Sequence, residues 1–368
     1  MQFVDELTIS AVSLYRYHIA LTPTLPVAKQ RIDHRQGLVL LTSVINSNQQ
    51  EHQFWVEIAP LSGIDTEGLA IEGFSQESLD EVITALSQIA KQLIGKSPNA
   101  LMALAATSTF ASVAFGLSLL HAKLCHQLPC RIEIPYTQSV TVPLVYSGMS
   151  EQQLQAKLHQ NGSINSVKVK VAQTSMEDEI AFVYRVLTLA PQVSLRLDAN
   201  RGFTPEQAID FLACLPKDKI EFIEEPCINP ADNPLIYQQL GVRYALDESL
   251  NSATFDVINA IKQQAGIAAL VIKPMLLGSL ADLQHMIDAA HIEGVRCILS
   301  SSLESDIGIT DLQLLSQALT PNETPGLDTL GAFSQLLLID STPSSKLNVN
   351  ALQLVYHAGN IDKTTTAL

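Results

Sequence analysis

The amino-acid sequence predicts an α/β protein in which a parallel (β/α) barrel follows a smaller α+β domain. Short apolar segments alternate with amphipathic helical patterns after about residue 130, and an earlier region has β-like alternation followed by one helical stripe. No glycine-rich GxGxxG or GxxxxGK turn follows a predicted strand, which disfavours a doubly wound nucleotide-binding sheet. At 368 residues with 47% apolar composition, the chain is long enough for a large buried core and for about two domains.

The smaller domain is predicted from the first part of the chain. Alternating runs at 8–17, 37–43 and 53–58 favour β-strands, and apolar residues recur on one stripe of a helix over 76–93. Residues 97–120 carry no charge and are long enough to cross a bilayer, but serine and threonine side chains interrupt them and no basic cluster flanks them. We therefore expect a buried helix there.

The barrel is predicted from the second part of the chain. The expected helices cover 150–159, 176–189, 205–214 and 279–293. The expected strands cover 140–146, 167–171, 193–198, 220–224, 244–247, 268–273 and 295–300, with 326–328 as a weak eighth. Eight parallel strands close into a barrel, and the chemistry of such barrels lies at the carboxyl ends of the strands.

Ionisable or hydroxyl side chains end six consecutive strands of this barrel. In chain order they are Lys168 and Lys170, Asp198, Glu224, Asp247, Lys273, and Ser300, Ser301 and Ser302. Each alone has an ordinary structural explanation as a helix cap or a loop residue, but the ordered series does not. Three carboxylates at one height repel each other unless a cation lies among them, and an all-oxygen ligand set suits Mg²⁺. Arg196, two residues before Asp198, is expected to be a structural ion-pair partner inside the barrel.

Composition and charge argue against several classes of partner. Thirty-seven acidic against 22 basic residues give a net charge of −15, which disfavours nucleic acid and anionic membrane as partners. The five cysteines have no metal-ligand spacing and are interpreted as free thiols in a reducing compartment. The first residues have no basic region followed by an apolar run, so a cytoplasmic location is expected. No apolar stripe stands clear of the core pattern, which leaves the oligomeric state open and compatible with a monomer.

The motifs "KVK", "LDAN", "IEEP", "DES" and "IKP" resemble those of the enolase superfamily in its muconate-lactonising branch, over nearly the whole chain. The resemblance implies a modified TIM (β/α) barrel with an α+β capping domain. It places the capping domain at residues 1–105, completed by a segment of about 340–368, and the catalytic barrel at 106–339. Residues 24–40 resemble the family's mobile loop and second strand, whereas residues 62–72 lengthen a link that is short in the family.

The resemblance also implies a role for each polar residue. Lys170 matches the general acid/base, Lys168 its partner, and Lys273 a lysine that stabilises a developing enolate. In "IEEP", strand alternation turns the first glutamate towards the other ligands and the second to the opposite face. The residues that match Mg²⁺ ligands, with Mn²⁺ as a substitute, are Asp198, Glu224 and Asp247. The residues that match substrate-pocket positions are Asn200, Ser300, Ser301, Ser302 and Arg35.

Within the superfamily, "FIEEPC", "ILSSSLESDIGIT" and "TPGLDTL" look most similar to lyases of menaquinone biosynthesis that remove water from a succinyl-bearing cyclohexadiene carboxylate. The resemblance implies a small anionic substrate and removal of a proton next to a carboxylate, which forms an enediolate that needs positive charge nearby.

Three alternatives remain open. An N-acylamino acid racemase or dipeptide epimerase of the same superfamily would use Lys170 and Lys273 as opposed bases. A metal-free aldolase would form a Schiff base at Lys273, although this leaves the three carboxylates unexplained. A non-catalytic barrel would keep the fold as a binding or assembly protein.

Overall fold

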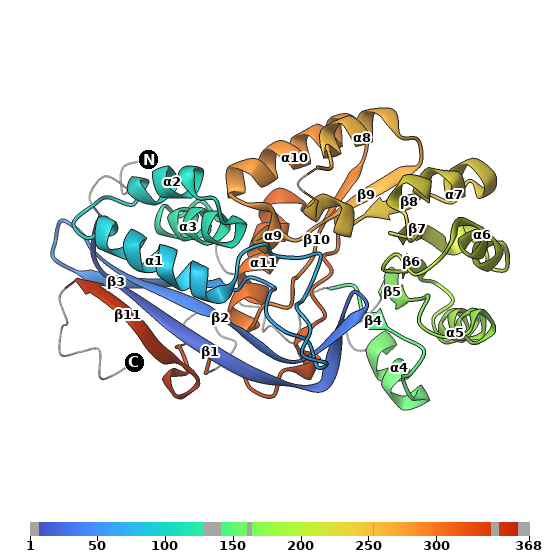
Figure 1. Cartoon of the computed structure of the whole chain (residues 1–368), viewed down its shortest axis with the longest axis horizontal. Coiled ribbons are helices and arrows are strands. Elements are labelled where there is room, and N and C mark those ends of the chain that lie inside the picture. Colours follow the sequence, from blue (N-terminus) through green and yellow to red (C-terminus); the bar gives the residue numbers. More distant parts are fainter. Residues whose placement is uncertain (1–6, 129–140, 160–163, 253, 340–345, 360–368) are drawn as a thin grey trace.

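The computed structural model contains two sheets, one in each of two packed domains (Figure 1). It describes residues 7–128, 141–159, 164–252, 254–339 and 346–359. One sheet has four antiparallel strands and the other has seven parallel strands in sequential order. The expected fold class, a parallel barrel with an α+β domain beside it, is confirmed.

The antiparallel sheet is built from both ends of the chain. Its strands are β1 (Thr8–Val27), β2 (Gln30–Ile45), β3 (Glu51–Ile58) and β11 (Gln353–Gly359), in the order β11-β1-β2-β3. Because β11 pairs antiparallel with β1, a late segment of the chain completes the sheet of the amino-terminal domain. The flanking residues 340–345 and 360–368 of the expected segment lie outside the described residues.

The β1–β2 hairpin is longer than the sequence predicts. Strands were expected to end at residue 17 and to resume at residue 37, but pairing continues to Val27 and Gln30 at the hairpin tip. The register shifts between Ala20 and Leu25, as at a β-bulge. The tip is stabilised by burial of a small apolar cluster that includes Leu21, Val27, Ile32, Leu61 and Ala332. Residues 24–40, expected as a loop and a strand, therefore form the tip and the returning arm of the hairpin.

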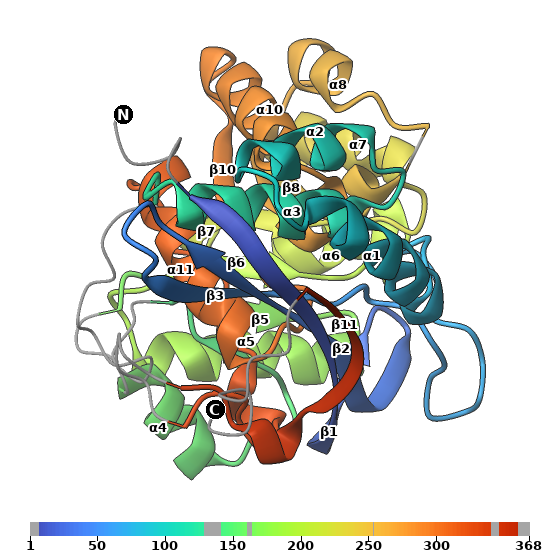
Figure 2. The ribbon, with the colours of Figure 1, turned by 90° about the vertical axis from the view of Figure 1, so that its left-hand side faces the viewer.

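Helices α1 (Leu79–Leu93), α2 (Asn99–Thr107) and α3 (Ala111–Leu124) cover one face of this sheet (Figure 2). Helix α1 begins with a capping box between Ser78 and Glu81. The uncharged residues 97–120, expected as one helix, belong to two helices, α2 and α3. Between them the Phe110 amide donates a hydrogen bond to the Ser108 hydroxyl at 3.2 Å, and this local bond replaces the helical pattern. No helix in the described ranges is long and apolar enough to cross a membrane.

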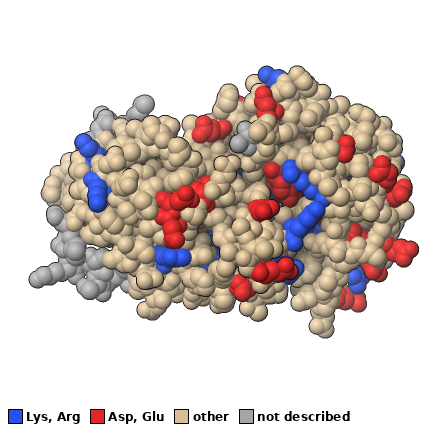
Figure 3. All heavy atoms as spheres, viewed as in Figure 1, with Lys and Arg blue, Asp and Glu red and all other residues tan. Residues whose placement is uncertain are grey.

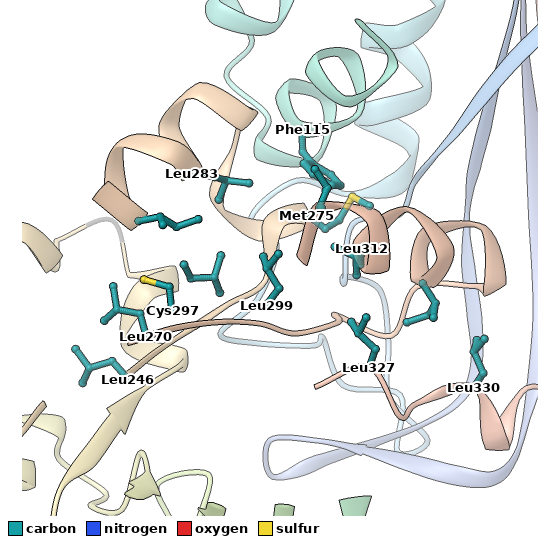
Figure 4. Close-up of a cluster of buried hydrophobic side chains, with 14 of the residues drawn as sticks. Phe115, Leu246, Leu270, Met275, Leu283, Cys297, Leu299, Leu312, Leu327 and Leu330 are labelled. Atoms are coloured by element: carbon teal, nitrogen blue, oxygen red, sulfur yellow. The ribbon is translucent and has the colours of Figure 1, made fainter. Parts of the chain in front are cut away.

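Helix α3 lies between the two domains. Phe115 on α3 belongs to the same buried cluster as Met275 and Leu312 of the barrel (Figure 4). Gly116 lies so close to β3 that a Cβ there would be 2.3 Å from Ile58 Cγ1. The expected domain boundary at residue 105 therefore falls before a helix that packs directly on the antiparallel sheet.

The barrel strands follow the predicted series closely. Their helices are α4 (Glu151–His159), α5 (Met176–Leu189), α6 (Pro205–Ala213), α7 (Asn233–Leu240), α8 (Val257–Gln263), α9 (Pro274–Leu277), α10 (Leu280–Ile292) and α11 (Asp306–Leu319). The strands are β4 (Leu144–Val145), β5 (Ser166–Lys170), β6 (Ser194–Asp198), β7 (Ile220–Glu224), β8 (Tyr244–Leu246), β9 (Ile267–Ile272) and β10 (Arg296–Leu299). Strand β4 is shorter than the expected 140–146, and residue 140 lies outside the described residues.

The weak eighth strand closes the barrel between β10 and β4. Gly326 forms a parallel bridge with Ser300, and its amide donates to the Leu299 carbonyl at 2.9 Å. On the other side, the Val142 amide donates to the Pro325 carbonyl at 3.0 Å. Backbone hydrogen bonds therefore continue around the barrel although this segment is too short to count as a strand.

Charged side chains fill the barrel near the amino ends of its strands. Arg196 Nε lies 3.0 Å from Glu221 Oε2, and Arg296 donates to both Glu221 and Glu323 at 2.7–2.9 Å. The Arg196 side chain is only 6% exposed. The expectation that Arg196 is a structural ion-pair partner is confirmed.

The close contact of α3 with β3 predicts the effect of a small substitution. We expect Gly116→Ala to lower the free energy of unfolding by about 1–3 kcal/mol, because the added methyl group overpacks the buried Ile58 side chain. Urea denaturation measures this loss, and Gly116→Ala should cost less in an Ile58→Ala background, because that change removes both Cγ1 and Cδ1 of Ile58. Gly331→Ala is the control, since a Cβ there meets nothing within 4 Å and should change stability by less than about 0.5 kcal/mol. Equal losses in the two single variants would contradict the packing argument.

Candidate active site

A pocket of about 430 Å³ opens at the carboxyl ends of the barrel strands, beneath the tip of the β1–β2 hairpin. Residues of the tip, including Pro23 and Val27, line it from above. Acidic side chains lie across both halves of the face shown in Figure 3, whereas Lys and Arg lie in a few small groups. Predicted site residues that line the pocket are Lys168, Lys170, Asp198, Asn200, Asp247, Lys273, Ser300, Ser301 and Ser302.

Strand alternation on β5 places two lysines on the same side. Val167 and Val169 are fully buried on one face of β5, whereas Lys168 and Lys170 point into the barrel mouth. Lys170 is in register with Asp198 on β6, which is in register with Glu224 on β7. The parallel register therefore brings the ends of three strands to one height.

Each lysine is paired with a carboxylate. Lys168 Nζ lies 2.8–2.9 Å from both oxygens of Glu224 and 2.8 Å from Asp198 Oδ2. Lys170 Nζ lies 2.6 Å from the same Asp198 oxygen, so two ammonium groups share one acceptor. Lys273 Nζ lies 2.6 Å from both oxygens of Asp247.

The carboxylates and lysines shift each other's proton affinity. Burial disfavours the ammonium of Lys168, but the carboxylates of Asp198 and Glu224 outweigh burial and raise its pKa above the usual value. Burial acts against the Asp198 carboxylate, but Lys168 and Lys170 outweigh it and hold its pKa below the usual range. Burial and the neighbouring Asp198 charge raise the pKa of Glu224 well above its usual value. Of the three carboxylates, Glu224 is therefore the one whose charged form its surroundings favour least.

The charge balance indicates what such a cluster requires. The negative charges of three carboxylates and the positive charges of three ammonium groups cancel only while every lysine keeps its proton. If one lysine acts as a base, the buried cluster becomes negative, and a divalent cation restores the balance. No three His, Cys, Asp or Glu side chains in the described ranges are grouped so that they could hold a metal ion as they stand, and lysines contact oxygens of all three carboxylates. The donor set, three buried carboxylates on adjacent strands, fits a hard cation in its chemistry.

The second glutamate of "IEEP" has a different role from the first. Glu225 is fully buried on the opposite face from Glu224, and its Oε1 accepts the backbone amides of Asp247 and Ser249 at 3.1 and 2.8 Å. Arg201 Nε donates to Glu225 Oε2 at 3.1 Å. Glu225 therefore fixes the turn that presents Asp247, and the alternation argument that selected Glu224 holds in the geometry.

Two acidic residues near the pocket were missed by the sequence reasoning. Glu179 accepts the backbone amides of residues 172–174 at 2.5–2.9 Å and so fixes the turn after Lys170. Glu248 lines the pocket beside Asn200, whose amide donates to Glu248 Oε1 at 2.8 Å. Burial, followed by the Asp247 charge, raises the pKa of Glu248 to about 7. The sequence signal that could have indicated Glu248 as a site residue is its position directly after Asp247.

Asn200 connects Lys170 to this acidic group. Lys170 Nζ donates to Asn200 Oδ1 at 2.6 Å, in addition to its bond to Asp198 Oδ2. The Asn200 φ of 41° lies in the left-handed region, which asparagine adopts more readily than most residues. Asn200 is therefore placed to orient the Lys170 amine.

The three serines line the pocket, but their hydroxyls already have partners in the protein. Ser300 Oγ donates to the Gly326 carbonyl at 3.0 Å, and Ser301 Oγ lies 3.0 Å from Thr329 Oγ1. Ser302 Oγ donates to the buried carboxylate of Glu304 at 2.6 Å. Ser302 is therefore directed away from the pocket more than the other two.

Arg35 is not where a substrate-binding residue is expected. It is 2% exposed, it is not among the residues that line the pocket, and its guanidinium donates to backbone carbonyls. The acceptors, at 2.7–3.4 Å, are the carbonyls of Gln36, Ala59, Pro60, Ser302 and Leu303. The expected direct contact with substrate is therefore corrected: Arg35 joins the capping domain to the loop after β10.

The lengthened link at residues 62–72 lies along the hairpin tip rather than in the pocket. Gln30 at the tip donates to Asp65 and to the Ala70 carbonyl, both at 2.8 Å. Leu61 and Phe74, which flank the link, line the pocket, and Lys273 Nζ lies 5.8 Å from the centre of the Phe74 ring. The lengthened link therefore supports the tip from outside.

Two family models match the chain. Residues 9–124 match "MenC, N-terminal domain" and residues 150–349 match "Enolase C-terminal domain-like". A curated o-succinylbenzoate synthase of Klebsiella pneumoniae is 33% identical over 92% of this chain and 98% of that protein. One of Yersinia enterocolitica is 33% identical over 95% of this chain and 99% of that protein. The chain belongs to the o-succinylbenzoate synthase family.

Solved structures of this superfamily show the same fold with more than one activity. An o-succinylbenzoate synthase of Thermosynechococcus elongatus with Mg in its active site has a TM-score of 0.66 at 24% identity, covering 90% of this chain and 96% of that chain. A dipeptide epimerase of Enterococcus faecalis with Mg and a dipeptide has a TM-score of 0.69 at 21% identity, covering 96% of this chain and 98% of that chain. Structural likeness at this level supports the fold, whereas membership in the o-succinylbenzoate synthase family rests on the sequence matches.

The position of Arg35 predicts a loss of stability when it is replaced. We expect Arg35→Lys to lower the free energy of unfolding by about 2–4 kcal/mol, because a lysine cannot reproduce the planar set of donors and leaves buried carbonyls unpaired. Urea denaturation measures the loss. Arg16→Lys on the same sheet is the control, since that side chain is 37% exposed and should change stability by less than about 0.5 kcal/mol. Unchanged stability with a raised KM would instead mean that Arg35 contacts the substrate.

Proposed function

We propose that this member of the o-succinylbenzoate synthase family catalyses the Mg²⁺-dependent syn-dehydration of 2-succinyl-6-hydroxy-2,4-cyclohexadiene-1-carboxylate to 2-succinylbenzoate in menaquinone biosynthesis. The observation that carries the proposal is the shared Asp198 oxygen, which holds the Lys168 and Lys170 ammonium groups side by side at the pocket. Two amines at one carboxylate, with further carboxylates on the next strands, suit proton removal beside a substrate carboxylate.

Lys170 is the proposed proton carrier. Its amine takes the ring proton at C1, and the electron pair of that bond moves into the C1 carboxylate to give an enediolate. The bond from C6 to its hydroxyl group then breaks, and the Lys170 ammonium gives its proton to the leaving hydroxide, so that water departs and the ring becomes aromatic. Asp198 and Asn200 orient the Lys170 amine for both transfers. One lysine on one face is enough for a syn elimination.

The other charged residues hold the developing negative charge. Lys168 and Lys273 present ammonium groups to the pocket, and both are fixed by carboxylates. Asp198, Glu224 and Asp247 are the residues that would hold Mg²⁺, with Mn²⁺ as a substitute. When bound, the metal supplies positive charge that stabilises the enediolate form of the carboxylate.

The remaining assignments complete the proposal. Asn200 and the hydroxyls of Ser300 and Ser301 line the space for a small anionic substrate, with Ser302 behind them. A cytoplasmic location is supported by thiols that are free in the described part of the chain, namely Cys125, Cys214, Cys227 and Cys297; Cys130 lies outside that part. Free thiols suit a reducing compartment.

A racemase or epimerase activity is the second candidate, because Lys170 and Lys273 both line the pocket. In that reaction, one lysine would remove a proton from an amino acid derivative and the other would return one from the opposite face. Lys273 would then have to exchange protons with the substrate, rather than stay charged beside Asp247.

Replacing the proton carrier tests the mechanism. We expect Lys170→Ala to lower kcat by about 10²–10⁴-fold while product binding is retained, because the general acid/base is lost and the pocket is not. Dehydration and racemisation of N-succinyl amino acids are measured in parallel on the wild type and the variant. Lys219→Ala, which loses only an exposed bond to the Pro191 carbonyl, is the control. Dehydration that survives Lys170→Ala, or a wild type that only racemises, would overturn the proposal.

Removing the metal tests the carboxylate cluster. We expect EDTA to abolish dehydration and added Mg²⁺ to restore it, because the cluster lacks a charge once a lysine becomes neutral. Calorimetry should also show Mg²⁺ binding to be weaker by roughly tenfold or more in Glu224→Gln, which loses a charged ligand. Glu221→Gln on the same strand is the matched control, since its partners are two arginines and the Ser166 hydroxyl, near the amino ends of the strands. Full activity in EDTA, with a borohydride-trapped adduct at Lys273, would instead support the aldolase.

A further inference from the structure

The proposed substrate carries a second carboxylate, at the end of its succinyl arm, and the site described so far provides no free cation for it. Lys168, Lys170 and Lys273 are each paired with carboxylates of the deep cluster. Much of the rest of the pocket is apolar, with side chains such as Leu25, Tyr146 and Met149. A carboxylate that leaves water for such a surface needs a charged partner or several donors.

Lys157 is a cation in the pocket wall outside the deep cluster. Among the described residues that line the pocket, the cationic ones are Lys157, Lys168, Lys170 and Lys273. Lys157 lies on α4, and its Nζ is 2.6 Å from both oxygens of Asp328. Its side chain is 27% exposed, so the ammonium is held in place but remains accessible.

Asp328 holds this lysine close to β4, the strand next to β5, and β5 carries Lys168 and Lys170. Asp328 Oδ2 also accepts the backbone amide of Leu144 at 3.0 Å, and Leu144 on β4 is the register partner of Lys168 on β5. Two donors therefore satisfy the Asp328 carboxylate. An ammonium has three N–H groups, so the two oxygens of Asp328 leave at least one for a ligand.

Two hydroxyl groups line the same pocket as Lys157. Thr329 follows Asp328 directly, lines the pocket, and has its Oγ1 3.0 Å from Ser301 Oγ. One of these two hydroxyls donates to the other, which leaves a second hydroxyl hydrogen for a ligand. An ammonium and a hydroxyl pair that line one pocket match the needs of a carboxylate, which forms its strongest hydrogen bonds with charged donors.

We propose that Lys157, held by Asp328 and assisted by Ser301 and Thr329, binds the terminal carboxylate of the succinyl arm and so selects substrates whose arm ends in a negative charge. This assignment rests on the proposed function for the identity of the arm. The competing explanation is structural: the Lys157–Asp328 pair also joins α4 to the segment that closes the barrel, and that role alone requires no ligand.

Calorimetry with two ligands separates these explanations. 2-Succinylbenzoate carries the terminal carboxylate, and 2-butanoylbenzoate has a methyl group in its place. With Mg²⁺ present, we expect the wild type to prefer 2-succinylbenzoate by about 10–100-fold, the usual effect of a hydrogen bond to a charged group. Lys157→Gln should weaken 2-succinylbenzoate binding by a similar factor and leave 2-butanoylbenzoate binding within about twofold, whereas Lys157→Arg should keep most of the preference.

Lys123→Gln is the matched control, because Lys123 Nζ also pairs with both oxygens of an aspartate, Asp311, at 2.6–2.8 Å but lies outside the pocket lining. It should leave the preference between the two ligands unchanged. A wild type that binds both ligands equally, or a Lys157→Gln variant that weakens both equally, would overturn the assignment and leave the structural role. Because binding is measured without turnover, an intact preference in a protein that does not dehydrate would reject the proposed reaction and keep Lys157 as the carboxylate-binding residue.

Discussion

The organisation of the site depends on one constraint, the charge balance among buried carboxylates and lysines at the mouth of the barrel. Asp198 Oδ2 contacts the ammonium groups of both Lys168 and Lys170, and two positive groups on one oxygen repel each other. Lys168 has a second carboxylate, Glu224, whereas the other contact of Lys170 is the neutral amide of Asn200. Of the two ammonium groups, that of Lys170 therefore contacts fewer carboxylates than that of Lys168.

Buried carboxylates outside the cluster fix the backbone that carries it. Glu179 accepts hydrogen bonds from consecutive backbone amides in the turn after β5, and Glu225 accepts them from two nearby amides in the turn after β8. Glu57 on β3 does the same across the domain boundary, where it accepts from the Tyr17 hydroxyl and from the Ser305 and Gly308 amides at the start of α11. A carboxylate at a helix start is stabilised by the amides exposed there. The capping domain is therefore joined to the barrel by charged contacts close to the serines at 300–302.

The sequence predicted those features that depend on local alternation or on strand order. The lysine pair on β5 and the choice of Glu224 over Glu225 follow from which face a strand residue points to. The weak closing strand at 326–328 follows from the repeat of strand and helix along the chain. The sequence did not predict features that depend on distant partners. Arg35 contacts the Leu303 carbonyl 268 positions away, and the hairpin extends to Val27 because its tip packs on Leu61. No periodic pattern in either segment encodes such contacts.

The fold alone does not choose between dehydration and racemisation, since solved structures with this architecture include both a synthase and an epimerase. The two reactions require different roles of Lys273. A racemase needs two lysines that exchange protons, but both oxygens of Asp247 lie 2.6 Å from Lys273 Nζ. Burial opposes the Lys273 ammonium, and Asp247 and Glu248 outweigh burial and raise its pKa. A lysine held charged in this way stabilises an enediolate but is a poor base. The pairing of Lys273 with both oxygens of Asp247 therefore agrees with the proposed syn elimination, in which Lys170 alone carries the proton.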